Sequence, residues 1–264
     1  MKKLLPLMIF LSIGMLALSQ PEKKLIPVTT GSKSALAYYN QAMKYFDDVN
    51  LGESISTFKK ALKEDPDFFM VNYQLAFFYL LNRDVNSFAD YARAAINCKA
   101  DLSEAEGLLK EVLVSFKEGH TKISGFGEKL VEMYPNDPNS YNNLISFQSI
   151  EGDSTGVVET LNKAIKVFPE QASFYNQLGY AYLTLLQSDK AEAAFDKYTE
   201  LDPKNPNVYD SKGDYYMFVK KYDKAYESYM TASSMNPSYS TEKAKIARQL
   251  YEQTEGKTLE IISI

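Results

Sequence analysis

The sequence predicts an all-α solenoid of about six helix-turn-helix repeats, each 34 residues long, followed by a C-terminal capping helix. Three observations lead to this prediction. Prolines recur at a fixed interval of 34 residues, at Pro135, Pro169, Pro203 and Pro237. Apolar residues between the prolines recur at helical spacing. Small residues stand at two fixed places in most of the units. A constant period of this length indicates units that stack on their neighbours.

The repeat unit is clearest over residues 173–203. Its first helix carries Gly179, and its second helix carries Ala191 and Phe195 on one face. The glycine and the alanine let the two backbones approach closely, and the aromatic side chains fill the space between neighbouring units. Pro203 marks the end of the second helix, because a residue that precedes proline is disfavoured in helical geometry.

The pattern extends over residues 34–237 and is weakest in the third unit. Glu111 and Ile123 stand there in place of the two small residues. Ser103 and Glu106 have the spacing of a capping box, which fixes the start of a helix at that point. We therefore expect six helix pairs with a wider crossing, or a change of superhelical pitch, around the third and fourth units.

These residues and their spacing resemble the tetratricopeptide repeat. The resemblance implies a right-handed superhelix in which the first helices of successive units line a concave face, and extended peptides commonly bind there in this family. A solenoid also needs a terminal helix to cover its last stacking surface. Residues 239–256 fit that role, and their expected apolar face consists of Ala244, Ile246, Ala247 and Leu250.

The chain is expected to have five segments: a signal peptide at 1–19, a linker at 20–33, the solenoid at 34–238, the capping helix at 239–256 and a tail at 257–264. Two lysines followed by a short apolar run are typical of a secretory signal. The run is short for a membrane span, so an uncleaved anchor is the lesser alternative. We expect a periplasmic or secreted protein with no membrane span in the mature chain.

The composition excludes several classes of function. A formal charge of −5 disfavours nucleic-acid binding, which needs a concentrated basic surface. The single histidine, His120, and the single cysteine, Cys98, do not suffice for a histidine or thiolate metal cluster. His120 also has no sequence support as a catalytic base. We expect no catalytic residue, no cofactor and no metal, and we place Cys98 in the core.

The concave stripe supplies the candidate binding residues, which change along the solenoid from apolar and aromatic to amide-bearing and then acidic. They are Tyr39, Met43, Phe46, Tyr73, Phe77, Leu80, Asn142, Ser146, Asn176, Tyr180, Asp210 and Asp214. The stripe has no lysine or arginine, so it does not suit the acidic chain terminus that some family members clamp. Coverage of its apolar part by Lys23–Thr30, by the tail or by a second copy is an open alternative.

Together these observations predict a non-catalytic protein–protein interaction scaffold of the bacterial cell envelope, which binds a peptide or protein in the concave groove. The alternative is an accessory or regulatory module of an envelope enzyme or transporter complex that contacts glycan. The groove hypothesis predicts that Phe77→Asp abolishes partner capture without unfolding the protein.

Overall fold

The computed structural model describes residues 24–120, 122–237 and 239–259, which form thirteen α-helices and no strand. The helices are α1 (Lys33–Asp47), α2 (Leu51–Glu64), α3 (Phe69–Leu81), α4 (Val85–Ile96), α5 (Glu104–Lys117), α6 (Ser124–Met133), α7 (Pro138–Glu151), α8 (Ser154–Val167), α9 (Ala172–Thr184), α10 (Ser188–Leu201), α11 (Pro206–Phe218), α12 (Tyr222–Met235) and α13 (Thr241–Glu255).

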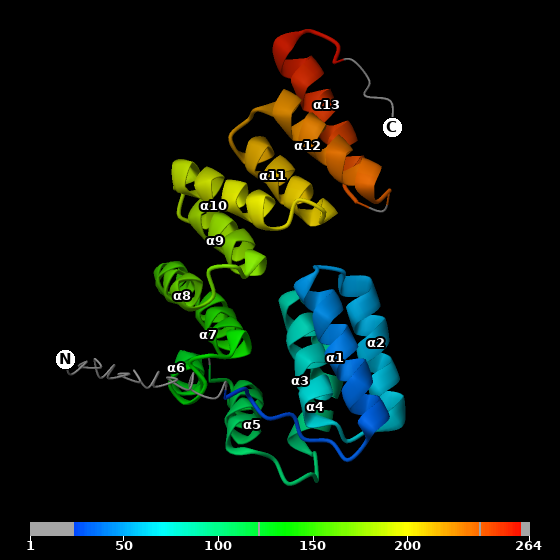
Figure 1. The fold of residues 1–264 in the computed structure, drawn as a ribbon, viewed down its shortest axis with the longest axis vertical. Coiled ribbons are helices and arrows are strands. Elements are labelled where there is room, and N and C mark those ends of the chain that lie inside the picture. The colour runs from blue at the N-terminus through cyan, green and yellow to red at the C-terminus, as the bar shows by residue number, and fades with distance from the viewer. Residues whose placement is uncertain (1–23, 121, 238, 260–264) are drawn as a thin grey trace, which may run out of the picture.

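The first twelve helices form six consecutive pairs that stack into a curved solenoid, and α13 packs on α12 at its end (Figure 1). This confirms the predicted architecture. The expected signal peptide lies outside the described residues. Within them, no helix combines the length and the apolar character that crossing a bilayer requires.

The turn inside each helix pair contains one residue in the left-handed backbone region. These residues are Val49, Arg83, Gly119, Gly152, Leu186 and Lys220. Four of the six have side chains, so glycine spacing alone does not reveal the turn. The turn is nevertheless a second marker of the repeat, because it has nearly the same period as the prolines.

The small residues act as the sequence indicates. In the fifth pair, Ala191 and Phe195 are fully buried, and a Cβ atom on Gly179 would lie 2.6 Å from the ring of Phe195. In the sixth pair, a Cβ atom on Gly213 would lie 2.4 Å from the ring of Tyr229. The glycine of each first helix therefore makes room for an aromatic ring of the second helix.

The third pair departs from the others, as expected. Its second helix, α6, has 10 residues, whereas α8, α10 and α12 have 14. It packs more closely on α7 than on its own partner α5, and a Cβ atom on Gly127 would lie 2.7 Å from Cα of Leu144. The carboxylate of Glu151, at the end of α7, accepts hydrogen bonds from the amides of Ile123 and Ser124. The fourth repeat therefore caps the helix of the third.

The first helix of that pair begins as predicted. Ser103 accepts a hydrogen bond from the amide of Glu106, and the Glu106 carboxylate accepts one from the amide of Ser103. This reciprocal capping satisfies two backbone donors at the helix start. Cys98 is also where we expected it: it is buried, and its thiol donates to the carbonyl of Asp67.

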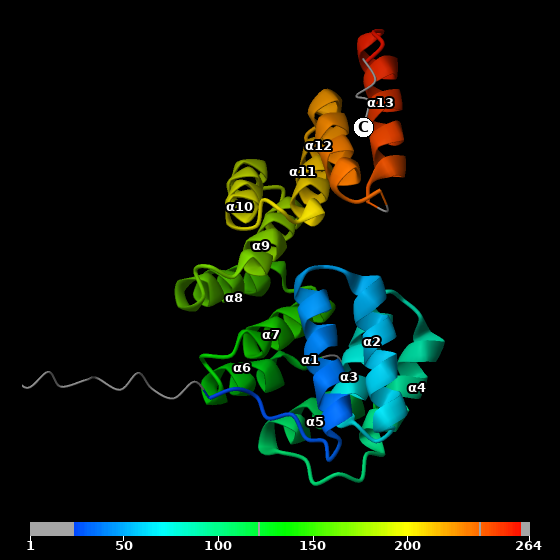
Figure 2. The same ribbon diagram turned by 45° about the vertical axis from the view of Figure 1, so that its right-hand side comes forward.

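Residues 24–30, which we call the strap, are part of the folded unit. The amide of Ile26 donates to Oδ2 of Asp137 at 2.7 Å. Thr29 donates its amide and its hydroxyl to the carboxylate of Glu106, at 2.8 and 2.6 Å. The strap thus runs past the third and fourth repeats before it reaches the start of α1 (Figures 1 and 2).

The capping helix differs in one respect from the prediction. Ala244 and Ala247 are buried, but Ile246 is 50% exposed. Successive residues of a helix are 100° apart, so a residue two positions from Ala244 lies on nearly the opposite side. The buried face of α13 therefore consists of small residues, which let it lie close to α12.

Candidate binding pocket

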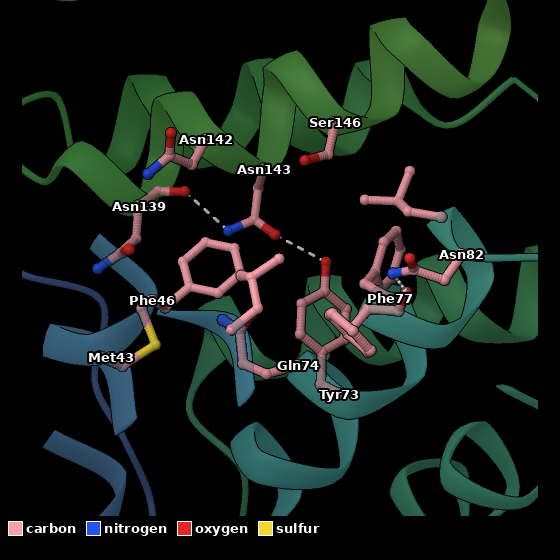
Figure 3. Close-up of a pocket in the computed structure, with 13 residues that line it drawn as sticks. Met43, Phe46, Tyr73, Gln74, Phe77, Asn82, Asn139, Asn142, Asn143 and Ser146 are labelled. Carbon is pink, nitrogen blue, oxygen red and sulfur yellow. Dashed lines mark hydrogen bonds between the residues drawn. The ribbon is translucent and has the colours of Figure 1, made fainter. Parts of the chain in front are cut away.

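A pocket lies where the second repeat faces the fourth, between α1, α3 and α7, and encloses about 230 Å³ (Figure 3). Its apolar part comes from α1 to α3, and its polar wall comes mainly from α7. The lining residues are Met43, Phe46, Leu51, Tyr73, Gln74, Phe77, Phe78, Leu81, Asn82, Asn139, Asn142, Asn143 and Ser146. None of these side chains is charged.

The two walls are joined directly across the third repeat. The hydroxyl of Tyr73 donates to Oδ1 of Asn143 at 2.7 Å, and both side chains are buried. Nδ2 of Asn143 donates in turn to the carbonyl of Asn139 at 2.8 Å. The rings of Phe77, on α3, and Phe147, on α7, also meet, with their centroids 5.7 Å apart. The contact fixes the distance between α3 and α7 and hence the shape of the pocket.

Half of the predicted stripe meets in this pocket. The six residues are Met43, Phe46, Tyr73, Phe77, Asn142 and Ser146. The remaining lining residues were missed, although Asn139 and Asn143 flank Asn142 on the same helix. The cluster of amide side chains on α7 was a signal in the sequence that could have revealed them. No signal indicated that Tyr73 is the buried hydrogen-bond partner of Asn143.

Tyr39 and Leu80 lie in or against the core instead. Tyr39 is 5% exposed, and its ring packs against those of Phe58 and Phe68. Burial raises the pKa of Tyr39 well above its usual range, and the charges of Asp137 and Glu106 add to this. Leu80 is partly buried against the same cluster. Tyr39, in the second turn of α1, packs on Phe68 at the start of the second repeat. Met43 and Phe46, in the later turns, line the pocket.

Asn176 and Tyr180 belong to a different part of the solenoid. Tyr180 lines a separate hollow between α7, α8 and α9, together with Ser149, Gln177 and Thr184. Oδ1 of Asn176 is buried and accepts no hydrogen bond from the described residues. Neither residue reaches the pocket that α1, α3 and α7 form.

The negative charge at the acidic end of the stripe is partly balanced by the chain itself. Nζ of Lys243, on α13, lies 2.9 Å from Oδ2 of Asp210 and 2.8 Å from Oδ1 of Asp214. Asp214 also accepts hydrogen bonds from the hydroxyls of Tyr180 and Tyr229, at 2.8 and 2.6 Å. Burial alone lowers the pKa of Lys243, but its bonds to the two carboxylates outweigh that effect and raise it.

The other reactive residues do not converge. His120 is exposed in the turn of the third pair, where its Nε2 lies 3.6 Å from a carboxylate oxygen of Glu118. Among the described residues, no group of three histidine, cysteine, aspartate or glutamate side chains is placed to hold a metal ion.

The strap does not cover the pocket. Its partners Asp65, Glu106 and Asp137 lie at the ends of helices, and no strap residue is among those that line the pocket. Leu259, the last described residue, packs against the cluster of α12 and α13. Residues 260–264, the rest of the expected tail, lie outside the described residues.

Known proteins share both the sequence pattern and the fold. A tetratricopeptide repeat family model matches residues 172–205 and 206–239. The fold is similar to that of a thermophilic tetratricopeptide repeat protein from Thermus thermophilus, with a TM-score of 0.50 and 18% identity over 82% of this chain and 98% of that one.

Another solved structure, the type IV pilus biogenesis factor PilW, covers 81% of this chain and 99% of its own at 16% identity, with a TM-score of 0.48. No curated protein sequence matches the chain. The matched units coincide with the two helix pairs α9–α10 and α11–α12, and the remaining pairs continue the same stack. Residues 172–239 therefore match the tetratricopeptide repeat family, and the chain as a whole has the fold of a tetratricopeptide repeat solenoid.

Proposed function

We propose that this protein is a non-catalytic scaffold that binds a neutral, apolar segment of a protein partner in the pocket between α1, α3 and α7. The observation that supports this most directly is the chemistry of the pocket. It combines apolar and aromatic side chains with a wall of amides, and none of its lining residues is charged.

The apolar part of the pocket would hold one or two side chains of the partner. Burial of apolar surface stabilises a complex by about 25 cal/mol per Å². Phe46, Leu51 and Leu81 are unusually exposed for large apolar residues, and exposed apolar groups that lie together often mark a contact surface. They form the accessible rim of the pocket.

The amide wall would recognise the backbone of the partner. An asparagine side chain both donates and accepts hydrogen bonds, as a peptide group does. Asn143 is already engaged by Tyr73 and Asn139, and Oδ1 of Asn142 accepts a hydrogen bond from Nε2 of Gln177 at 3.2 Å. The side chain of Asn139 and Nδ2 of Asn142 are therefore the better candidates for this contact. A free carboxylate or an ammonium group would find no opposite charge here, which favours an internal segment over a chain terminus.

The place of action that we propose is the periplasm or the extracellular space. It rests on the signal pattern of residues 1–19. A scaffold there would act on other exported proteins, including an enzyme or a transporter complex of the envelope.

Binding is best tested at the rim, because Phe77 is 6% exposed and its ring touches those of Tyr73, Phe116 and Phe147. Phe77→Asp would bury a carboxylate in an aromatic cluster and unfold the protein, contrary to our expectation from the sequence. Phe46→Asp and Leu81→Asp place the same charge at positions that are 40% and 56% exposed.

The experiment is a crosslinking pull-down from the native envelope, quantified by mass spectrometry. Phe218→Asp is the matched control, because Phe218 is 43% exposed and lies outside the pocket. We expect a partner that is captured by the wild type and the control and lost with both rim variants, at equal melting temperatures. Capture that persists with the rim variants would overturn the proposal.

A further inference from the structure

A second groove lies between α4 and α5, where the second and third repeats pack loosely. It encloses about 440 Å³ and shares no lining residue with the pocket described above. The groove is found where the repeat pattern fails. Because α6 is short and packs towards α7, α5 receives little support from its own pair.

The floor of the groove is apolar. Phe88, Ala92 and Ile96 contribute from α4, and Leu113 and Phe116 contribute from α5. The rings of Phe88 and Phe116 meet edge to face, with their centroids 6.1 Å apart. Ala92 and Leu113 are buried, while both phenylalanines and Ile96 are only half-buried. The half-buried side chains leave apolar surface that a ligand would cover.

The rim of the groove is cationic. Arg93 and Lys117 both line it, and no aspartate or glutamate does. Arg93 pairs with Asp90 of its own helix at 3.3 Å, and both side chains are mostly exposed, so that pair contributes little. Lys117 forms no ion pair with the described residues. The exposed amide of Asn97 adds a further donor at the rim.

We propose that this groove binds an amphiphile with a single alkyl chain and a carboxylate, such as a fatty acid. The alkyl chain would lie on the apolar floor, and the carboxylate would contact Arg93 or Lys117. The planar guanidinium group suits a carboxylate in particular. The volume falls within the range of about 300–1,000 Å³ that small-molecule sites occupy, so a small ligand fits better than a partner helix.

The test is isothermal titration of the purified, delipidated full-length chain with sodium dodecanoate, below the concentration at which it forms micelles. We expect one molecule bound per chain. Ala89→Phe should abolish binding, since Ala89 lines the groove and is exposed, so that a larger side chain fills the groove without entering the core. If Ala89→Phe folds poorly, Ala89→Leu replaces it: its smaller side chain also occupies the groove and should also abolish binding.

The charge requirement is tested separately. The double variant Arg93→Gln and Lys117→Gln should raise the Kd for dodecanoate about tenfold, as the loss of two exposed charge contacts predicts. Dodecanol should bind the wild type no better than dodecanoate binds the double variant. Phe218→Asp is the control, which should bind dodecanoate as the wild type does.

Three results would overturn the proposal: no binding to the wild type, undiminished binding to folded Ala89→Phe, or equal binding of dodecanol and dodecanoate. The outcome is independent of the partner pull-down, because the groove and the pocket share no residue.

Discussion

The hydroxyl of Tyr73 donates a 2.7 Å hydrogen bond to Oδ1 of Asn143, and this bond joins the second repeat to the fourth. In a solenoid each repeat ordinarily contacts only its neighbours. In this protein the third repeat does not separate the second repeat from the fourth at the Tyr73–Asn143 contact. The irregular repeat thus accounts for the contact and for the pocket beside it.

Tyr73→Phe tests this contact. The variant keeps the ring but leaves the buried Oδ1 of Asn143 without its donor, which should lower the free energy of unfolding by about 1–3 kcal/mol. Tyr209→Phe is the control, because its hydroxyl bonds to the carbonyl of Pro203 at an exposed site. Chemical denaturation measures both variants. Equal losses would mean that the link between repeats adds nothing beyond an exposed bond.

Gly179→Ala tests the close crossing of α9 and α10. The new methyl group would lie 2.6 Å from the ring of Phe195, and overpacking of this kind costs about 1–3 kcal/mol. At Gly107, within α5, an added Cβ meets nothing within 4 Å. Gly107→Ala should therefore stabilise the protein by about 0.5–1 kcal/mol. Melting curves that shift in the same direction for both variants would contradict this account.

Glu151→Ala tests the cap that the fourth repeat provides for α6. The carboxylate accepts from the amide of Ser124 at 2.7 Å and from its hydroxyl at 2.9 Å. Loss of a cap costs about 0.5–2 kcal/mol, and hydrogen exchange should speed up in α6 before the other helices. Glu200→Ala removes an exposed ion pair with Lys197 and should cost less than about 0.5 kcal/mol. Unchanged exchange in α6 would rule out the capping role.

Alkaline pH should destabilise the fold. Burial raises the pKa of Tyr198 to about 12 and that of Tyr215 to about 12, from an ordinary 10.0. A folded-state pKa above the unfolded value contributes stability that is full below about pH 10 and is lost as the pH rises towards 12. Denaturation from about pH 8 to about pH 11 should show this decline. Tyr198→Phe should make the decline shallower, and an unchanged slope would count against the assignment.

The regular part of the fold could be predicted from the sequence because it is local. The proline interval and the pairing of Gly179 with the second helix each lie within one repeat of 34 residues. The same locality explains why half of the predicted stripe, which was read from the first helices, lines the pocket. Met43, Phe46 and Phe77 lie on their own helices at the expected spacing.

The rest depends on contacts between distant residues. Nothing near Tyr73 in the sequence indicates a bond to Asn143. The two residues meet only because the irregular third repeat does not separate the second repeat from the fourth. Lys243 pairs with both Asp210 and Asp214 from α13, a helix outside the six repeats. Ile246 was assigned to the buried face from its apolar character, but its angular position on α13 leaves it exposed.

The strap has a consequence for the order in which the chain folds. Ile26 is separated from its partner Asp137 by 111 positions, a span that is long for a solenoid, in which contacts are mostly local. During synthesis the N-terminal segment emerges first. At about 5–20 residues per second, it waits roughly 5–20 s for the ribosome to produce the turn that receives it. The first two repeats can therefore form before Asp137 is available to Ile26, and the strap binds the third and fourth repeats as a late step.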